Sequence, residues 1–258
     1  MTSVYLYGLL RRPDLGAALA GQPVDALSGS VEARKIGEWS LAYGPSDGTP
    51  VPQRRRFLKG HARVLEDLMA HGPLLPFRFG HVSHDAARID HLITAAADEI
   101  SATFERLEGH AELGLRIAFP REAALASTLA QDDGLRQQRD RLVSHAGGSQ
   151  LDQIAFGRRV AETLDLRRGL AQKALLKTLR PLARDHVLQA PEDDVQVLRA
   201  AFLVPETEVA AFTRAVEEAA SCCGFADAAP EIRLVHPTPP FNFVSFSLAD
   251  ADMDSEVV

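Results

Sequence analysis

Apolar and polar residues follow a strand-like pattern at the start of the chain, in the segment SVYLYGLL over residues 3–10. Side chains on both sides of this alternation are apolar, which is typical of a strand in the centre of a sheet. A short helix is predicted over 13–20. The segment SVEARKIGEWSLAYG then predicts two strands around a turn at Gly37 and Glu38, and PSDGTPVP is expected to be a loop.

From Phe57 onward the spacing of the apolar residues changes to that of a helix. The pattern predicts a helix that ends at the Gly-Pro pair 72–73. A second, longer helix is predicted from apolar residues spaced by threes and fours over 89–107. Ser83 is its expected N-cap and Gly109 its expected stop.

The segment HAELGLRIAF, residues 110–119, alternates cleanly between apolar and polar positions and predicts a half-buried strand. With this strand, the order of elements suits an α+β domain that has helices on one face of a mixed sheet, similar to a ferredoxin-like split βαβ fold. We therefore expect the fold class α+β with two domains. The N-terminal ferredoxin-like domain is expected to cover 1–119.

Residues 120–248 predict a second α+β unit that contains a long helical segment. The long helix is expected from about 151 to 185, with an interruption at Pro181 and a hinge candidate at Gly147-Gly148-Ser149. After it, VQVLRAAFLV predicts a strand, the next apolar stretch a helix, and EIRLVHP and FNFVSFSL two further strands. Residues 249–258 are acidic and small, and they predict a disordered tail.

Composition is that of an ordinary soluble protein, with 46% hydrophobic and 24% charged residues. The net charge of -7 has the wrong sign for contact with phosphate and argues against a nucleic-acid partner. The first residues lack the features of a secretory signal, and no stretch reaches the roughly 18 apolar residues of a membrane span. We expect a cytoplasmic protein, and we expect the adjacent Cys222 and Cys223 to be core residues.

Histidines and aspartates crowd the segment GHVSHDAARIDH, where a strand is expected to lead into a helix. The residue types suit a metal ion, which would make the chain a metal-dependent enzyme of unknown substrate. Their spacing is poor, because helical ligand pairs are normally three or four residues apart. The favoured interpretation is a solvated face, with Asp85 at the positive helix terminus. The candidate ligands are His81, His84, Asp85 and His91.

Basic residues gather in the segment QRRRFLKGHAR, at Arg54, Arg55, Arg56, Lys59 and Arg63. Positive charge opposes the helix dipole at this terminus, so the cluster indicates either an anionic partner or simply a solvated face. The anionic partner would be a phosphate group or an acidic protein surface. No glycine-rich phosphate loop and no nucleophile elbow occurs in the sequence, and no cofactor is expected.

Arg78 lies between two phenylalanines in the apolar segment LLPFRFG. In a strand its side chain would face away from Phe79, and Gly80 would allow a sharp turn into the next helix. A partly buried guanidinium needs a carboxylate, and Glu66 and Asp67 on the preceding helix are available. A structural ion pair is the favoured prediction, and direct contact with a partner is the alternative.

Several segments resemble one known family. HARVLEDLMAHGPLLPFRFGHV is similar to the helix and the Leu-Pro-x-Arg-Phe-Gly motif of the gas vesicle accessory proteins GvpL/GvpF. The next segment of that family, in which a turn leads into a strand, is similar to RLEGHAELGLRIAF. The family's late strand and helix are similar to VLRAAFLVPETEVAAFTRAV. HPTPPFNFVSF resembles the closing Gly-Pro-Trp-Pro-Pro-Tyr-Ser-Phe. The chain departs from this closing motif at His236, Thr238, Phe241 and Asn242, and GLRQQR only approximates the family's Tyr-Leu-x-x-Arg.

The resemblance implies a non-enzymatic role in building gas vesicles, within the cytoplasm and associated with the vesicle. Members of the family resemble two-domain α+β proteins that contact the small, apolar main shell protein, so this protein and other gas vesicle proteins are the expected partners. Three forms of the role stay open: chaperone, nucleation factor or minor structural component. The structural or partner-binding candidates are Arg54, Arg55, Arg56, Glu66, Arg78, Phe79, Gly80, Pro239, Pro240, Phe241 and Phe243.

Overall fold

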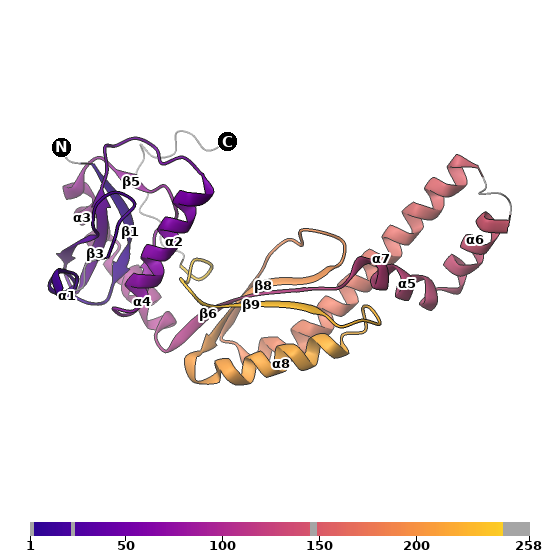
Figure 1. Cartoon of the computed structure of the whole chain (residues 1–258). Helices are drawn as coiled ribbons and strands as arrows, with labels where there is room; N and C mark the ends of the chain where they lie inside the picture. Colours follow the sequence, from indigo (N-terminus) through magenta and orange to yellow (C-terminus); the bar gives the residue numbers. More distant parts are fainter. Residues whose placement is uncertain (1–2, 22–23, 145–148, 245–258) are drawn as a thin grey trace. The chain divides into compact units, whose positions relative to one another are not determined.

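The computed structural model describes residues 3–21, 24–144 and 149–244 and contains both helices and sheets, so the α+β class is confirmed (Figure 1). Two compact units divide the chain: Met1–His110 together with Pro237–Val258, and Ala111–His236. The expected hinge glycines Gly147 and Gly148 and the expected acidic tail 249–258 lie outside the described residues.

The sheet of the first unit is built around β1 (Val4–Leu10), in which every residue is buried, as the alternation predicted. The strand order is β2-β3-β1-β4, and β5 (Val82–Ser83) also pairs with β1. All these pairs are antiparallel, so the predicted mixed sheet is wrong. The other strands are β2 (Glu32–Ile36), β3 (Trp39–Pro45) and β4 (Leu74–Pro76).

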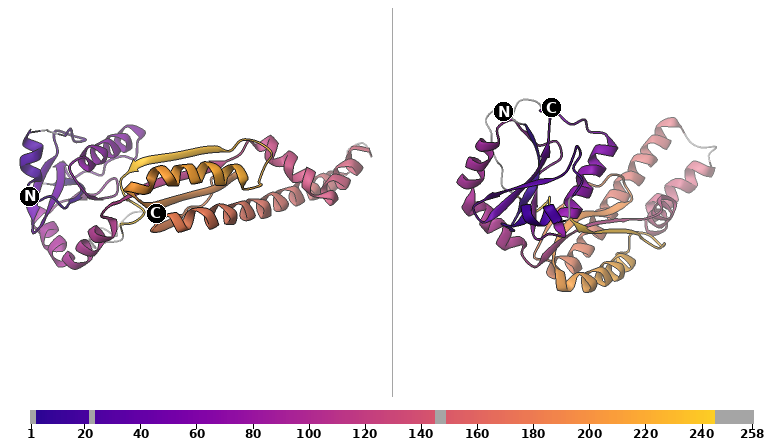
Figure 2. Two further views of the ribbon diagram at one scale, coloured as in Figure 1. Left: turned by 90° about the horizontal axis from the view of Figure 1, so that it is seen from below. Right: turned by 60° about the vertical axis from the view of Figure 1, so that its left-hand side comes forward.

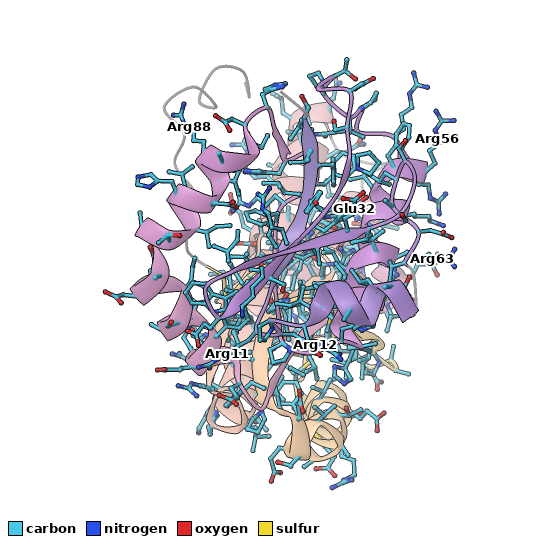
Figure 3. All side chains as sticks on the ribbon, turned by 90° about the vertical axis from the view of Figure 1, so that its left-hand side faces the viewer. Arg11, Arg12, Glu32, Arg56, Arg63 and Arg88 are labelled. Atoms are coloured by element: carbon cyan, nitrogen blue, oxygen red, sulfur yellow. The ribbon has the colours of Figure 1, made fainter. Side chains whose placement is uncertain are left out.

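Helices cover both faces of this sheet, whereas the sequence pattern predicted helices on one face only. Helices α1 (Leu15–Gly21) and α2 (Arg55–Met69) lie on one face, and α3 (Ala86–Ala95) and α4 (Ala97–Leu107) lie on the other (Figures 2 and 3). Both faces of β1 are apolar, and each must be removed from water. The core between β1 and the first pair of helices includes Tyr5, Tyr7, Leu15, Leu19, Val64, Leu65 and Leu68.

The single long helix predicted over 89–107 is in fact the pair α3 and α4. The chain bends at Ala96, whose φ of -93° and ψ of 15° are not helical. Asp85, not Ser83, is the N-cap, and its side chain accepts hydrogen bonds from the backbone N–H groups of Ala87 and Arg88. A carboxylate suits this position because it faces the positive end of the helix dipole.

The second unit contains a sheet of order β7-β8-β6-β9. Helices α7 and α8 pack against one another and against β8 (Figure 1). Phe119, Phe202, Phe212 and Phe225 belong to the core of this unit. The strands are β6 (His110–Ala118), β7 (Asp185–Leu188), β8 (Gln196–Pro205) and β9 (Glu231–Thr238), and the helices are α5 (Arg121–Gln131), α6 (Asp133–Ser144), α7 (Gln150–Leu179) and α8 (Val209–Cys222), with 3₁₀ turns at Arg180–Leu182 and Glu206–Glu208.

The boundary between the units falls at His110 and Ala111 and not at residue 119 as predicted. The predicted strand exists as β6, but it lies between β8 and β9 in the second sheet. Its apolar side chains Leu113, Leu115 and Ile117 are buried in the core of the second unit. The alternation predicted the apolar face of this strand correctly, although Glu112 on the opposite face is also buried. An alternation carries no information about which sheet receives the strand.

The C-terminal segment departs from the predicted strand FNFVSFSL over its described part. After β9, residues 241–243 form a turn, in which Phe241 N–H donates to the carbonyl of Pro239 at 2.7 Å and Phe243 N–H donates to that of Pro240 at 3.2 Å. The long helix also ends earlier than predicted, at Leu179, and residues 185–188 form β7. Pro181 cannot donate the backbone hydrogen bond that a continuing helix would need.

Candidate functional site

Arg78 is exposed, although the residue before it is buried. Strand β4 ends at Pro76, so the strand geometry expected for the phenylalanines and the arginine does not continue through them. Among the described residues, no ion pair or hydrogen bond joins Arg78 to Glu66 or Asp67, which are exposed on α2. The predicted buried ion pair is therefore wrong. The guanidinium is directed to solvent by a turn of the chain.

The loop that carries Arg78 is tied to the core at both ends. The Tyr5 hydroxyl oxygen lies 3.0 Å from Nδ1 of His61, and Nε2 of His61 lies 3.2 Å from the carbonyl oxygen of Phe77. The backbone N–H of Gly80 donates to the Tyr5 oxygen at 2.9 Å. Because a carbonyl can only accept, this assigns the proton to Nε2 of His61, and Nδ1 accepts from the Tyr5 hydroxyl.

Rings surround this hydrogen-bonded pair and keep both groups neutral. The centroids of Tyr7 and Phe79 each lie 5.7 Å from that of His61, whose exposed fraction is 3%. Burial lowers the pKa of His61 to about 4, and burial raises the pKa of Tyr5 to about 12. Neither group changes charge near neutral pH, so the pair acts as a clamp on residues 77–80.

Gly80 is required by the shape of the loop. Its φ of 90° lies in the left-handed region that side chains disfavour. In this conformation its N–H reaches the Tyr5 hydroxyl inside the unit. The Arg-Phe-Gly sequence thus has three separate roles: Gly80 makes the turn, Phe79 packs half-buried against Tyr5 and His61, and Arg78 is presented outside.

Helix α2 presents a row of positive charge, which we call the basic stripe: Arg54, Arg55, Arg56, Lys59 and Arg63. All these side chains are exposed, and none forms an ion pair within the described part of the chain. The guanidinium carbon of Arg56 lies 4.5 Å from the centroid of the Phe57 ring. Figure 3 shows Arg56 and Arg63 pointing away from the sheet. Arg54 is the N-cap and provides no side-chain cap, so nothing in the first turn offsets the helix dipole.

A groove of about 420 Å³ lies beside the start of α2. We call it the proline groove. Its wall includes residues on both sides of the arginines in sequence, since Pro52 precedes them and Phe57 follows them. Tyr5 also lines the groove and, through its hydroxyl, holds the loop of Arg78. The apolar wall is formed by Leu27, Pro45, Pro50, Val51, Pro52 and Phe57.

The candidate metal ligands have separate contacts. His84 Nδ1 lies 3.1 Å from the Ser3 hydroxyl, Asp85 caps α3, and the ring of His81 lies 5.2 Å from that of Phe77, centroid to centroid. His91 is exposed on α3. Within the described residues, no group of three His, Cys, Asp or Glu side chains is placed to hold a metal ion. The arrangement of these described side chains therefore does not support the metal site that was hypothesised from the sequence.

The C-terminal candidates divide into buried and exposed positions. Pro239 and Phe243 are buried, and Pro240 is half-buried. The guanidinium of Arg106, on α4, donates to the carbonyl of Phe243. Phe241 is 38% exposed. The hydrogen bond from Arg106 thus anchors Phe243 to α4, whereas Phe241 is open to a partner.

Sequence reasoning found the arginines and missed the features that organise them. The helical spacing of apolar residues gives no indication of the partner of His61, because Tyr5 lies 56 residues away in the chain. The groove wall comes largely from the segment PSDGTPVP, for which the sequence predicts only a loop. The usable signal was the run of prolines next to the arginines, since prolines in a loop restrict its shape.

No helix in the described part of the chain is long and apolar enough to span a membrane. The fold is α+β, and the features that stand out in its first unit are an exposed charged stripe and an apolar groove, which define a surface suited to contact with other molecules. The sequence model of the family described as Gas vesicle synthesis protein GvpL/GvpF matches residues 3–245. The chain belongs to this family.

Curated relatives support the same assignment. Gas vesicle protein F of Dolichospermum flosaquae is 28% identical over 190 residues, covering 72% of this chain and 77% of the relative. Gas vesicle protein F of Streptomyces sp. (strain CB03234) is 26% identical over 249 residues, covering 94% and 99%. The chain thus has a gas vesicle accessory role, in common with its family.

Two solved structures share the fold. The crystal structure of GvpF from Anabaena sp. PCC7120 has a TM-score of 0.80 and 25% identity, and the match covers 96% of this chain and 100% of that one. GvpF from Microcystis aeruginosa has a TM-score of 0.74 and 25% identity, with coverage of 95% and 100%. The similarity extends over both compact units.

Proposed function

We propose that this protein assists gas vesicle assembly by binding the main shell protein and other gas vesicle proteins through the first unit. One observation carries the proposal: the basic stripe, which forms no ion pair within the described residues, begins where the chain leaves the wall of the proline groove, so charge and apolar surface are offered close together. The exposed Arg78 adds a further cation to this unit. Membership of the family and the names of its relatives support the vesicle context.

The physical need for such a protein follows from the apolar character expected of the shell subunit. A subunit with a large apolar face aggregates in water unless that face is covered before assembly. An acidic protein with a net charge of -7 stays soluble and can hold such a subunit until it is incorporated. The role is one of binding in the cytoplasm and at the vesicle, with no cofactor and no chemical reaction.

We also infer that the first unit is a ferredoxin-like domain. The support is its order of elements, β1, α1, β2, β3, α2, β4, together with the sheet order β2-β3-β1-β4. This is the arrangement in which β3 lies between β1 and β2 and splits a βαβ unit. Helices α3 and α4 are additions that cover the second face of the sheet.

Co-expression with the main shell protein tests the function. We expect the tagged full chain to keep the shell protein in the soluble fraction and to co-purify with it. Equal amounts of shell protein in the pellet with and without this chain would refute the proposal. The other gas vesicle proteins of the host are tested in the same pull-down. Binding to none of them would also contradict the proposal.

Charge variants locate the interaction. Arg54→Glu combined with Arg55→Glu should reduce co-purification at least fivefold. The matched control is Arg158→Glu combined with Arg214→Glu, which makes the same change in net charge at exposed positions on α7 and α8. Equal losses in both double variants would indicate a general effect of charge and not a site on α2.

A further inference from the structure

The chain runs from one wall of the proline groove into the basic stripe, and the two features together restrict what can bind. The groove wall at Val51 and Pro52 leads directly into Arg54, Arg55 and Arg56, and the wall resumes at Phe57. A ligand that is seated in the groove and extends along the start of α2 therefore meets the beginning of the basic stripe. The site offers a groove of about 420 Å³, whose wall is apolar on one part and polar at Asp47 and Thr49, near concentrated positive charge.

The charged groups near the groove determine which way round a ligand with one acidic end would bind. Asp47 lines the groove, and its carboxylate accepts hydrogen bonds from the backbone N–H and the hydroxyl of Thr49, at 2.9 and 2.7 Å. These bonds lower the pKa of Asp47 and keep it charged. A ligand carboxylate is repelled by Asp47 and attracted by the arginines. Its negative charge must therefore lie at the α2 end.

The chemistry of the wall also limits how a ligand is held. Pro45, Pro50 and Pro52 have no N–H group, so at these positions the wall cannot extend a strand of a partner by backbone hydrogen bonds. Recognition has to come from side chains packing in the groove and from the guanidinium groups. Arginine suits this purpose because its planar fork binds carboxylates in two-point contacts.

The basic stripe is electrostatically unfavourable for α2 itself, and this also indicates a ligand. Positive residues in the first turn of a helix oppose its dipole, and like charges three or four residues apart repel one another. Arg56, Lys59 and Arg63 have this spacing on α2. Elsewhere in a chain with net charge -7, arginines pair with nearby carboxylates, as Arg34 does with Asp90 and Arg121 with Asp194. The basic stripe lacks such a partner within the described residues.

We infer that the proline groove binds a short peptide segment of a partner protein, with apolar side chains in the groove and a cluster of carboxylates against Arg54, Arg55 and Arg56. This inference rests on the proposed function, because it names the chemistry of the segment by which a gas vesicle protein docks. The charge complementarity selects this occupant, since an all-apolar segment would leave the arginines unpaired.

A labelled synthetic peptide tests the inference on the full chain. The probe is fluorescein-Leu-Val-Leu-Gly-Asp-Asp-Asp-amide, and its matched control replaces each Asp by Asn. We expect fluorescence anisotropy to show saturable binding of the acidic probe, at least tenfold tighter than the control at low salt. Binding should weaken when NaCl is raised, because exposed charges are screened. Equal binding of the two peptides would overturn the inference.

Two variants separate the charge from the groove. Arg54→Glu combined with Arg55→Glu should weaken probe binding at least tenfold, whereas the control pair Arg158→Glu and Arg214→Glu should change it less than twofold. Thr49→Trp places a large side chain at the exposed mouth of the groove and should also abolish binding. Circular dichroism verifies that each variant is folded. Full binding by folded Thr49→Trp would remove the groove from the proposal.

A third variant tests whether the occupant of the groove is a partner protein or the C-terminal segment of this chain. Asp250→Asn, Asp252→Asn and Asp254→Asn together neutralise carboxylates of the C-terminal segment. If these changes tighten probe binding tenfold or more, the chain's own segment is the occupant and the partner inference fails. Unchanged affinity supports the partner. Co-purification of gas vesicle proteins is scored separately: if it persists while the probe does not bind, the docking inference fails and the proposed function stands.

Discussion

The hydroxyl of Tyr5, on the central strand, and Nδ1 of His61, on α2, lie 3.0 Å apart and together hold the loop that presents Arg78. The strand supplies the oxygen, the helix supplies the ring, and the loop supplies a carbonyl and an N–H group. Within this cluster, the Tyr5 hydroxyl, both ring nitrogens of His61 and the two backbone groups of the loop all have hydrogen-bond partners. The position of Arg78 therefore depends on these hydrogen bonds.

Tyr5→Phe should destabilise the protein by about 1–3 kcal/mol, because it leaves the N–H of Gly80 and Nδ1 of His61 without their partner. Urea denaturation measures the loss of free energy of unfolding. Hydrogen exchange should show faster exchange of the Gly80 amide. An unchanged Gly80 amide in the variant would show that the loop is held by other contacts.

Stability should fall on acidification because of His61. The unfolded chain titrates near the ordinary value of 6.5, and the folded pKa is about 4, so the unfolded state binds more protons between these values. The contribution is fully present above pH 6.5 and is lost as the pH falls through this window, by about 3 kcal/mol in total. Urea denaturation between pH 7.5 and 4 measures it, as the difference between the native chain and His61→Gln. Parallel pH profiles for the two would contradict the prediction.

Arg78→Ala should change the free energy of unfolding by no more than about 0.5 kcal/mol, since the side chain is exposed and has no ion pair with Glu66 or Asp67. The same variant should reduce co-purification of gas vesicle proteins. The control is Arg214→Ala, at an exposed position on α8. A loss of several kcal/mol in stability would restore the structural role that the sequence alone predicted.

Arg55→Glu should stabilise the protein by roughly 0.3–1 kcal/mol while weakening partner binding. A carboxylate in the first turn of α2 interacts favourably with the helix dipole, where the native arginine does not. Thermal denaturation at low salt measures the gain, which should shrink as salt is added. A stability gain accompanied by undiminished binding would show that the charge at this position has no part in recognition.

Phe243→Ala and Phe241→Ala form a matched pair within one motif. Phe243 is 3% exposed, and its truncation should cost about 3–5 kcal/mol. Phe241 is 38% exposed, and its truncation should cost about 1 kcal/mol or less. Denaturant midpoints compare the two. If Phe241→Ala impairs co-purification at nearly native stability, this position belongs to the partner surface.

The sequence alone determined the elements whose periodicity is strong and the family to which their motifs belong. The strand at 4–10, the helix from 55 to 69 and the strand at 110–118 were all predicted, because an alternation or a helical spacing of apolar residues directly records which side chains leave water. The arginines of the basic stripe could also be identified from sequence. Uncompensated charge at a helix start is a local property.

The tertiary structure decided the relationships between elements distant in the chain. Strand β6 joins the second sheet, helices cover both faces of the first sheet, and Arg78 turns to solvent away from Glu66. None of these is encoded in a local pattern, because each depends on which apolar surfaces meet when the chain is compact. The pairing of Tyr5 with His61 and the shape of the groove are of the same kind. Local periodicity fixes which face of an element is buried, and long-range packing alone selects what that face is buried against.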